Sequence, residues 1–111
     1  MKTIFGQMIK GDLPCKKVFE NESVLAIEDI HPKAPVHILI IPKKEYQSVQ
    51  SIPKEELNII IDVIDVAQQL AIEFDIEDNY RLLTNNGKKA GQSVFHLHFH
   101  LIGGKELGPI A

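Results

Sequence analysis

Apolar residues recur along the chain with two different spacings, and these spacings predict its secondary structure. Near the start, the apolar residues at positions 4, 5, 8 and 9 fall on one face of a helix. Thr3 is suited to cap the beginning of this helix and Gly11 to end it. Short runs rich in β-branched and aromatic residues predict strands at 16–19, 24–28, 36–41, 79–84 and 94–102. The polar turn at 20–23 indicates that the first two strands form a hairpin.

A longer segment, residues 53–74, has helical spacing throughout, with Ser51 as its candidate cap. It carries two apolar stripes, one made of Leu57, Ile60, Ile61 and Ile64 and the other of Ile59, Val63, Val66 and Leu70. A helix that packs on one sheet needs a single stripe. The other stripe therefore predicts contact with a second surface, and we expect that surface to be another copy of the chain, in a homodimer.

Strands joined mostly by short turns, together with two helices, predict an α+β fold built on an antiparallel sheet. The 111 residues are the length of one domain, so residues 1–111 are expected to form a single unit. The longest apolar run, 36–41, is far shorter than the roughly 18–20 residues that a membrane span needs. We therefore expect a cytoplasmic protein that does not interact with membranes.

Charge and cysteine content restrict the partners further. The net charge is −3, which disfavours nucleic acid as a partner because a polyanion is bound by a basic surface. A single small phosphorylated ligand remains compatible, since a local loop of N–H groups can hold it. Cys15 is the only cysteine, so neither an intrachain disulfide nor a Cys-x-x-Cys metal site can form.

The most informative feature is a run of alternating histidines. His96, His98 and His100 are three of the five histidines, and apolar residues separate them. Side chains alternate between the two faces of a strand, so the three rings are expected on one face, with Phe95, Leu97, Phe99 and Leu101 on the other.

Four interpretations of this row compete. Three histidines buried only for packing would each need hydrogen-bonding partners. A catalytic zinc site needs three ligands and a structural one four, which five histidines could supply. Stacking on nucleic acid is disfavoured by the charge. Nucleophilic or acid–base catalysis is the interpretation that we favour.

The catalytic interpretation makes His98 the central residue. Neighbouring histidines disfavour each other's protonation, which keeps the middle ring neutral and able to attack phosphorus. Upstream, Gly87, Gly91 and Ser93 can direct backbone N–H groups and one hydroxyl at an anion. A histidine beside such a loop favours phosphoryl or nucleotidyl transfer, and the chain has neither a Gly-x-Ser-x-Gly elbow nor a Walker loop.

The run from His96 to Ile102 resembles the motif of the histidine triad (HIT) superfamily, in which three histidines alternate with apolar residues. The preceding Gly91-Gln92-Ser93-Val94 is similar to the Hint branch, the histidine triad nucleotide-binding proteins. Other segments resemble the same branch in order and spacing: Ile4-Phe5-Gly6, Ala34-Pro35-Val36-His37, Ile41-Pro42-Lys43-Lys44, Tyr80-Arg81 and Gly103-Gly104.

The resemblance implies a HIT-like fold: a five-stranded antiparallel sheet with two helices, paired into a homodimer with a continuous ten-stranded sheet. It also implies a purine nucleotide phosphoramidase, or nucleotidyl hydrolase, that acts on AMP or GMP conjugates without a cofactor or metal. Two alternatives stay open. One is a dinucleoside polyphosphate hydrolase, and the other is a nucleotide-binding regulatory module with incidental turnover.

The resemblance also implies roles for individual residues. His98 would be the nucleophile and form a nucleotidyl-histidine intermediate, with His96 orienting it through its carbonyl, His100 binding phosphate and His37 supporting the triad. Further expected contacts with the nucleotide are Asp29 and Ile30 at the ribose, Asn85, Gly91, Gln92 and Ser93 at the phosphate, with Ser93 also beside the leaving group, and Phe19, Ile27 and Glu28 around the base.

The chain departs from the family pattern at several places. Glu45 stands where animal Hint proteins have a histidine, and His31 where they have a serine. The end of the chain lacks the tryptophan of those relatives, so leaving-group preference is not carried over from them. The cysteine-containing zinc site of some family members is also missing.

Overall fold

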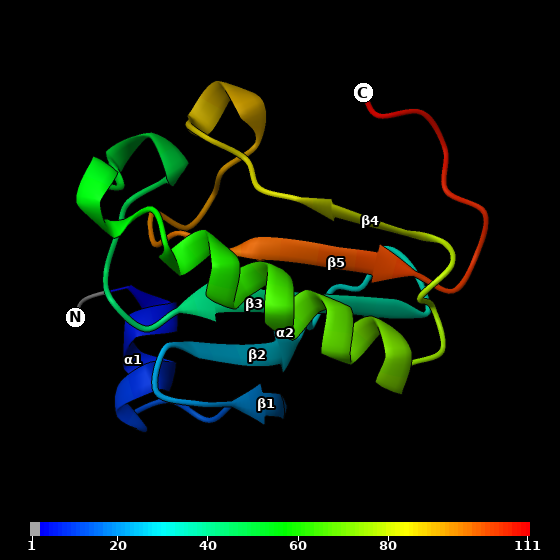
Figure 1. Cartoon of the computed structure of the whole chain (residues 1–111), viewed down its shortest axis with the longest axis horizontal. Coiled ribbons are helices and arrows are strands. Elements are labelled where there is room, and N and C mark those ends of the chain that lie inside the picture. Colours follow the sequence, from blue (N-terminus) through cyan, green and yellow to red (C-terminus); the bar gives the residue numbers. More distant parts are fainter. Residues whose placement is uncertain (1–2) are drawn as a thin grey trace.

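Five antiparallel strands form one sheet in the order β1-β2-β3-β5-β4, which confirms the predicted architecture. The computed structural model describes residues 3–111. Two α-helices accompany the sheet, and α2 crosses it in front of β3 and β5 (Figure 1). The elements are α1 Ile4–Lys10, β1 Lys17–Glu20, β2 Val24–Glu28, β3 Val36–Pro42, η1 Val49–Ser51, η2 Lys54–Glu56, α2 Ile59–Glu73, β4 Tyr80–Leu83, η3 Lys88–Ala90 and β5 Phe99–Gly103.

The caps predicted for the first helix are both present. The Thr3 hydroxyl accepts a hydrogen bond from Gly6 N at 3.0 Å and satisfies one of the free donors of the first turn. Gly11 closes the helix with a left-handed φ of 86°, a conformation that glycine adopts without strain.

The long helix begins later than its apolar pattern predicts. Residues 53–58 do not belong to α2, because the chain makes the two short 3-10 turns η1 and η2 before the helix starts at Ile59. Ser51, the predicted cap, instead closes η1 through a reciprocal pair of hydrogen bonds with Ser48. Pro53 precedes η2, so the prolyl ring separates two turns rather than starting the helix.

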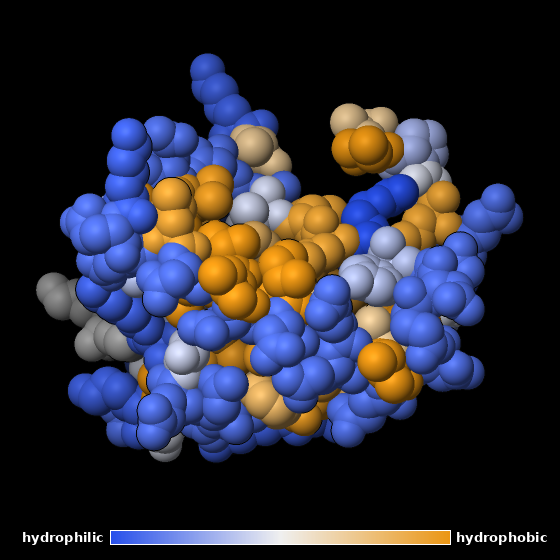
Figure 2. All heavy atoms as spheres, viewed as in Figure 1, coloured by the Kyte–Doolittle hydropathy of each residue, from blue (hydrophilic) through white to orange (hydrophobic). Residues whose placement is uncertain are grey.

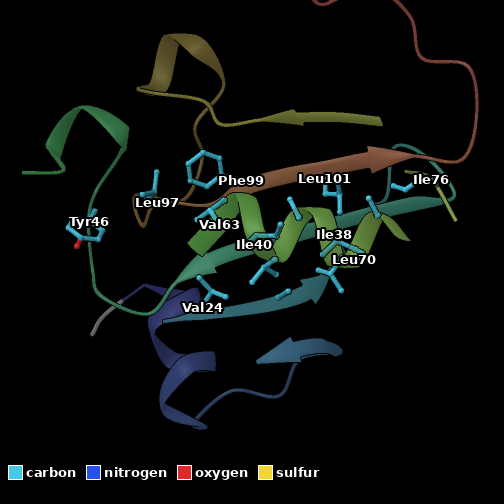
Figure 3. Packing of buried hydrophobic residues seen from close by; sticks show 14 of the residues in the cluster. Val24, Ile38, Ile40, Tyr46, Val63, Leu70, Ile76, Leu97, Phe99 and Leu101 are labelled. Atoms are coloured by element: carbon cyan, nitrogen blue, oxygen red, sulfur yellow. The ribbon is translucent and has the colours of Figure 1, made fainter. Parts of the chain in front are cut away.

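One face of the sheet is covered by α2 and holds the larger core. The helix contributes the inward stripe Val63, Val66, Ala67, Leu70 and Ala71. The strands contribute Val24, Ala26, Ile38, Ile40, Phe99 and Leu101. Figure 3 shows these side chains filling the space between α2 and the sheet, with Tyr46 and Leu97 at one end. We call this side the α2 face.

The other face is covered at one end by α1. Phe5 packs there against Leu25, Ile27, Leu39 and Ile41, which alternate with the residues of the α2 face. His37 and His100 belong to this second side, since His37 is two residues from Leu39 on β3 and His100 is the cross-strand partner of Leu39. We call it the histidine face, because it presents these two rings.

The last strand is shorter than predicted and begins at Phe99 rather than at residue 94. Leu97 N donates to Tyr46 O at 2.7 Å, a bond to a segment outside the sheet that takes the chain off the ladder. Leu97, Phe99 and Leu101 lie in the core of the α2 face as expected, but Phe95 is 46% exposed. The alternation of side chains therefore holds only from residue 97 onward.

The outward stripe of α2 remains uncovered in the single chain. Three residues of this stripe are exposed: Leu57, just before the helix, by 47%, and Ile61 and Ile64, within the helix, by 70% and 39%. In Figure 2 apolar side chains gather along the middle of the surface, where α2 runs in Figure 1. Among the described residues, no helix has both the length and the apolar character needed to cross a membrane.

Candidate functional site

Three of the five histidines come together on the histidine face: His37 from β3, His100 from β5, and His98 from the position just before β5. The rings of His98 and His100 lie 5.2 Å apart between centroids, and those of His37 and His100 are equally close. His37 Nε2 lies 2.9 Å from His100 Nδ1. Asp29 joins the group, with its Oδ2 3.4 Å from His37 Nε2. The structure thus brings together four of the residues that the resemblance assigns to the site.

His96 occupies a different place from the one expected of a strand residue. It lies in the bend before β5, and its side chain is fully buried. Its ring contacts Pro42 O through Nε2 at 2.9 Å and the Thr3 hydroxyl through Nδ1 at 3.2 Å. The row of three neighbouring rings is therefore incomplete, because His96 meets His98 through its backbone carbonyl rather than through its ring.

The hydrogen bonds determine which nitrogen of each neutral ring carries the proton. The carbonyl of His96 can only accept, so His98 Nδ1, 2.8 Å away, carries the hydrogen. The lone pair of His98 is consequently on Nε2, which has no hydrogen-bond partner among residues 3–111. Likewise the Pro42 carbonyl assigns the proton of His96 to Nε2, and Nδ1 accepts from the Thr3 hydroxyl.

The same reasoning extends to His37 and His100. Lys33 N–H donates to His37 Nδ1 at 3.0 Å, so in the neutral ring the hydrogen lies on Nε2. That N–H points at His100 Nδ1, which must accept, and the proton of His100 is then on its own Nε2. The chain of contacts thus leaves one ring, His98, with a free lone pair and the next ring, His100, with a free donor.

Burial keeps these rings neutral. It is the largest cause that lowers the pKa of His98, and the bond to the His96 carbonyl opposes it. Burial, followed by the neighbouring His98 and His37, lowers the pKa of His100 to about 4. Burial also lowers the pKa of His37, against the opposing charge of Asp29. At neutral pH the site therefore presents uncharged imidazoles, as nucleophilic attack requires.

This cluster is also a candidate metal-binding site. Asp29, His37 and His100 each offer an atom, and these atoms lie within 4.8 Å of one another. A zinc ion at about 2.0–2.1 Å from each ligand would need the lone pair of His37 Nε2. Because Lys33 N–H donates to His37 Nδ1, the hydrogen of the neutral His37 ring lies on Nε2, and Nε2 has no lone pair for a metal. In this arrangement His37 donates to His100, and Asp29 Oδ2 lies 3.4 Å from the same His37 nitrogen.

The loop between β4 and β5 holds the other predicted residues, Asn85, Gly91, Gln92 and Ser93. Thr84, which sequence analysis did not single out, donates to His98 O at 2.7 Å and so joins the start of the loop to the triad. Ser93 is exposed, and neither its N–H nor its hydroxyl has a hydrogen-bond partner among the described residues. The loop therefore presents at least one free backbone donor and one free hydroxyl.

The loop's glycines act differently from expectation. Gly87 N donates to Gln92 Oε1 and Gly91 N to Lys88 O, so both amides are used within the loop. Their contribution is conformational, because Gly87 and Gly91 have φ values of 95° and 104°. Gly91 lies beside the Asn85 side chain, whose amide nitrogen would be 3.5 Å from an added Cβ.

The residues expected around a base are dispersed. Phe19 pairs with Ala26 on β2 and packs against the core of the α2 face, so its placement contradicts the expectation. Glu28, opposite Ile38 of the same core, forms an ion pair with Lys16 at 2.8 Å. Ile27 lies on the histidine face but is buried beneath α1.

Among the described residues, Phe5 is the aromatic side chain whose ring contacts His98. Sequence analysis placed it on a helix face and in a segment that resembles the family, but gave it no role in the site. Its ring contacts the ring of His98 edge-on, with 4.9 Å between centroids. It could not be chosen over Phe19 from the sequence, because the choice depends on which face α1 covers. Ile30, next to Asp29, is 83% exposed at the rim of the site.

Comparison with known proteins agrees with this geometry. A HIT-like protein of Chlamydia pneumoniae is 52% identical over 109 residues, which cover 98% of this chain and 99% of the relative. A HIT family hydrolase from Clostridium thermocellum superposes with a TM-score of 0.93 at 46% identity, covering 97% of this chain and 95% of that one.

A histidine triad nucleotide-binding protein from Candida albicans superposes with a TM-score of 0.82 at 30% identity, over 99% of this chain and 86% of its own. Residues 10–107 match the HIT domain. This chain therefore belongs to the HIT domain family.

Proposed function

We propose that this protein is a hydrolase that releases a nucleoside monophosphate from an amine through a covalent intermediate on His98, as in the Hint branch of the family. The observation that carries the proposal is the hydrogen bond from His98 Nδ1–H to the His96 carbonyl at 2.8 Å. It places the lone pair on Nε2, toward the open side of the ring, in a neutral imidazole. The names of the clostridial hydrolase and the yeast nucleotide-binding protein support the same reaction class.

The reaction has two steps. His98 Nε2 attacks phosphorus, the new N–P bond forms as the bond to the amine breaks, and the amine takes up a proton from the solvent as it leaves. Water then attacks the nucleotidyl-histidine: its hydroxyl group stays on phosphorus, its other proton returns to the solvent, and the bond to Nε2 breaks with the electron pair returning to the ring. The free N–H of His100 and the hydroxyl of Ser93 are suited to bind the phosphate oxygens in both steps.

The proposed contacts with the rest of the nucleotide are assigned from where the residues lie around the histidines. Asp29 offers carboxylate oxygens at the rim as acceptors for the hydroxyls of a ribose, with the exposed Ile30 beside it. Asn85 lies beside Gly91 in the loop, and its side-chain amide, which has no hydrogen-bond partner among residues 3–111, is available to the phosphate. A purine base would lie near Phe5, whose ring contacts that of His98, rather than on Ile27, which α1 covers. We do not include Phe19 or Glu28, because their side chains belong to the α2 face.

The experiment is to measure AMP release from adenosine 5′-phosphoramidates with different amines. We expect turnover by the wild-type chain and a loss of a thousandfold or more in His98→Ala, the order of effect seen when a nucleophile is removed. His31→Ala is the matched control, because its exposed ring has no partner among the described residues and its removal should leave activity unchanged. Activity that survives in His98→Ala refutes the covalent mechanism.

The same assay separates the alternatives. A faster rate on diadenosine polyphosphates than on phosphoramidates would assign the chain to a dinucleoside polyphosphate hydrolase. Tight AMP binding without turnover of any phosphoramidate would make it a nucleotide-binding regulatory module.

We also propose that two copies pair into a homodimer with a continuous ten-stranded sheet. Support comes from β4, an edge strand, and from the exposed stripe of Leu57, Ile61 and Ile64. An apolar stripe of this kind is stabilised when a partner covers it. Sedimentation should give twice the chain mass for the wild type and a shift to the monomer for Ile61→Asp. A wild type that is monomeric at micromolar concentration overturns the proposal.

A further inference from the structure

Gln92 has the most completely satisfied polar side chain of the loop between β4 and β5. It is 4% exposed. Its Oε1 accepts from Gly87 N at 2.8 Å, and its Nε2 donates to Gln47 O at 2.6 Å and to Val94 O at 3.1 Å. The partners fix the orientation of the amide, because an N–H must meet the oxygen and two carbonyls must meet the nitrogen. Both N–H groups are therefore already in use.

These bonds close the loop onto itself. Gly87 is held twice, since its N–H reaches the side chain of Gln92 and its carbonyl accepts from Gln92 N at 3.1 Å. Val94, two residues further, is held by the same side chain. Ser93 lies between two anchored residues, so its free N–H and hydroxyl have a defined position although Ser93 itself is exposed.

The loop is also joined to the triad through one short piece of backbone, residues 46–50. Tyr46 O accepts from Leu97 N at 2.7 Å, beside His96 and His98. The next carbonyl, Gln47 O, accepts from Gln92. Gln50 N donates to the Asn86 side chain at 2.9 Å. Consecutive carbonyls thus hold the nucleophile's segment on one side and the phosphate loop on the other.

We propose that Gln92 is a positioning residue that fixes the phosphate loop relative to His98 by way of Gln47 and touches no substrate atom itself. The inference rests on the proposed function, because it assigns the loop a phosphate to hold. It replaces the expectation that Gln92 binds the phosphate directly. To turn its amide toward a phosphate would leave Gly87 N and the two carbonyls without these partners at a partly buried position.

Binding of AMP and adenosine by calorimetry isolates the role of the loop, since the two ligands differ only in the phosphate. We expect the wild-type chain to bind AMP more tightly than adenosine. Gln92→Met keeps the length of the side chain but none of its hydrogen bonds. It should reduce the ratio of the two affinities at least tenfold while adenosine affinity stays within twofold. Gln69→Met, the same exchange on the exposed side of α2, should leave both affinities unchanged.

Nuclear magnetic resonance distinguishes positioning from direct contact. In the free protein, the amide hydrogen of Gly87 should exchange at least tenfold faster in Gln92→Met, before any ligand is present. In the wild type, the side-chain NH₂ signals of Gln92 should keep their positions and their slow exchange when AMP saturates the site. NH₂ signals that shift like those of Ser93 on AMP addition would make Gln92 a ligand and overturn the proposal.

Other outcomes are equally decisive. An unchanged ratio of AMP to adenosine affinity in folded Gln92→Met overturns the positioning role, as does an equal loss of both ligands, which indicates general damage to the fold. If the wild-type chain binds neither ligand, the proposed function is refuted, and the inferred role falls with it. Failure of the inference alone is recognised by wild-type AMP binding that Gln92→Met does not alter.

Discussion

Thr3 connects the first helix to the catalytic segment, and Thr3→Val tests how much that connection contributes to stability. The hydroxyl makes two bonds: it accepts from Gly6 N at 3.0 Å and lies 3.2 Å from His96 Nδ1. Valine has nearly the same shape and can make neither bond. The substitution therefore isolates the hydroxyl from the packing of the side chain.

The magnitude follows from the two losses. Removal of an N-terminal cap costs about 0.5–2 kcal/mol. His96 is fully buried, so its Nδ1 would lose its partner without access to water, at a cost of about 1–3 kcal/mol. Together they predict a decrease of about 1.5–5 kcal/mol in the free energy of unfolding. For a domain of this size the melting temperature should fall by roughly 6–20 °C.

The assay is urea and thermal unfolding at one fixed protein concentration, since pairing of copies would make stability depend on it. Thr3→Ser keeps the hydroxyl and should stay within about 0.5 kcal/mol of the wild type. His96 also holds His98 through its carbonyl, so folded Thr3→Val should hydrolyse phosphoramidates more slowly. If valine and serine at this position are equally stable, the bond to His96 contributes nothing and the reasoning is refuted.

Four further predictions concern acid, the loop and α1. Protonation removes the lone pair of His98, and its pKa is lowered, so kcat/KM should stay level as pH falls to 6.5 and decline only below it. The pKa of His100 is about 4 in the folded protein and near 6.5 in the unfolded chain, so the unfolded chain binds the proton first as the pH falls. Urea titrations should therefore show the free energy of unfolding decreasing from pH 6.5 to 4. A constant free energy of unfolding over this range contradicts the lowered pKa. Gly91→Ala at φ 104° should cost about 1–3 kcal/mol and weaken AMP binding, whereas unchanged unfolding would show that the loop relaxes freely. Phe5→Ala should cost about 3–5 kcal/mol because Phe5 is 4% exposed, against less than about 1 kcal/mol for Ile4→Ala on the exposed side of the same helix.

Local patterns were sufficient for most of the fold. The hairpin of β1 and β2, the caps of α1 and the inward stripe of α2 depend on neighbouring residues, and sequence analysis placed them within a residue or two. The start of β5 was missed, because the bond from Leu97 N to Tyr46 O joins segments far apart in the chain. No periodicity in residues 94–98 contains that information.

In the candidate site too, local sequence predicted some positions and tertiary packing determined the others. Alternation placed His98 and His100 correctly near each other, and the family resemblance added Asp29 and His37. The buried position of the His96 ring depends on Thr3 and Pro42, which only tertiary packing brings to it. Phe5 was likewise missed in favour of Phe19, since the face that α1 covers cannot be obtained from spacing alone.

The strand order has a consequence for synthesis of the protein. β5 is made after the other four strands of this sheet, yet it lies between β3 and β4 and pairs with both. Until residue 103 has emerged from the ribosome, the apolar β3 has an open edge, and open edges of this kind associate with other chains. The segment that carries the nucleophile is therefore also the one that completes the sheet, so a growing chain cannot hold a functional site before its fold is closed.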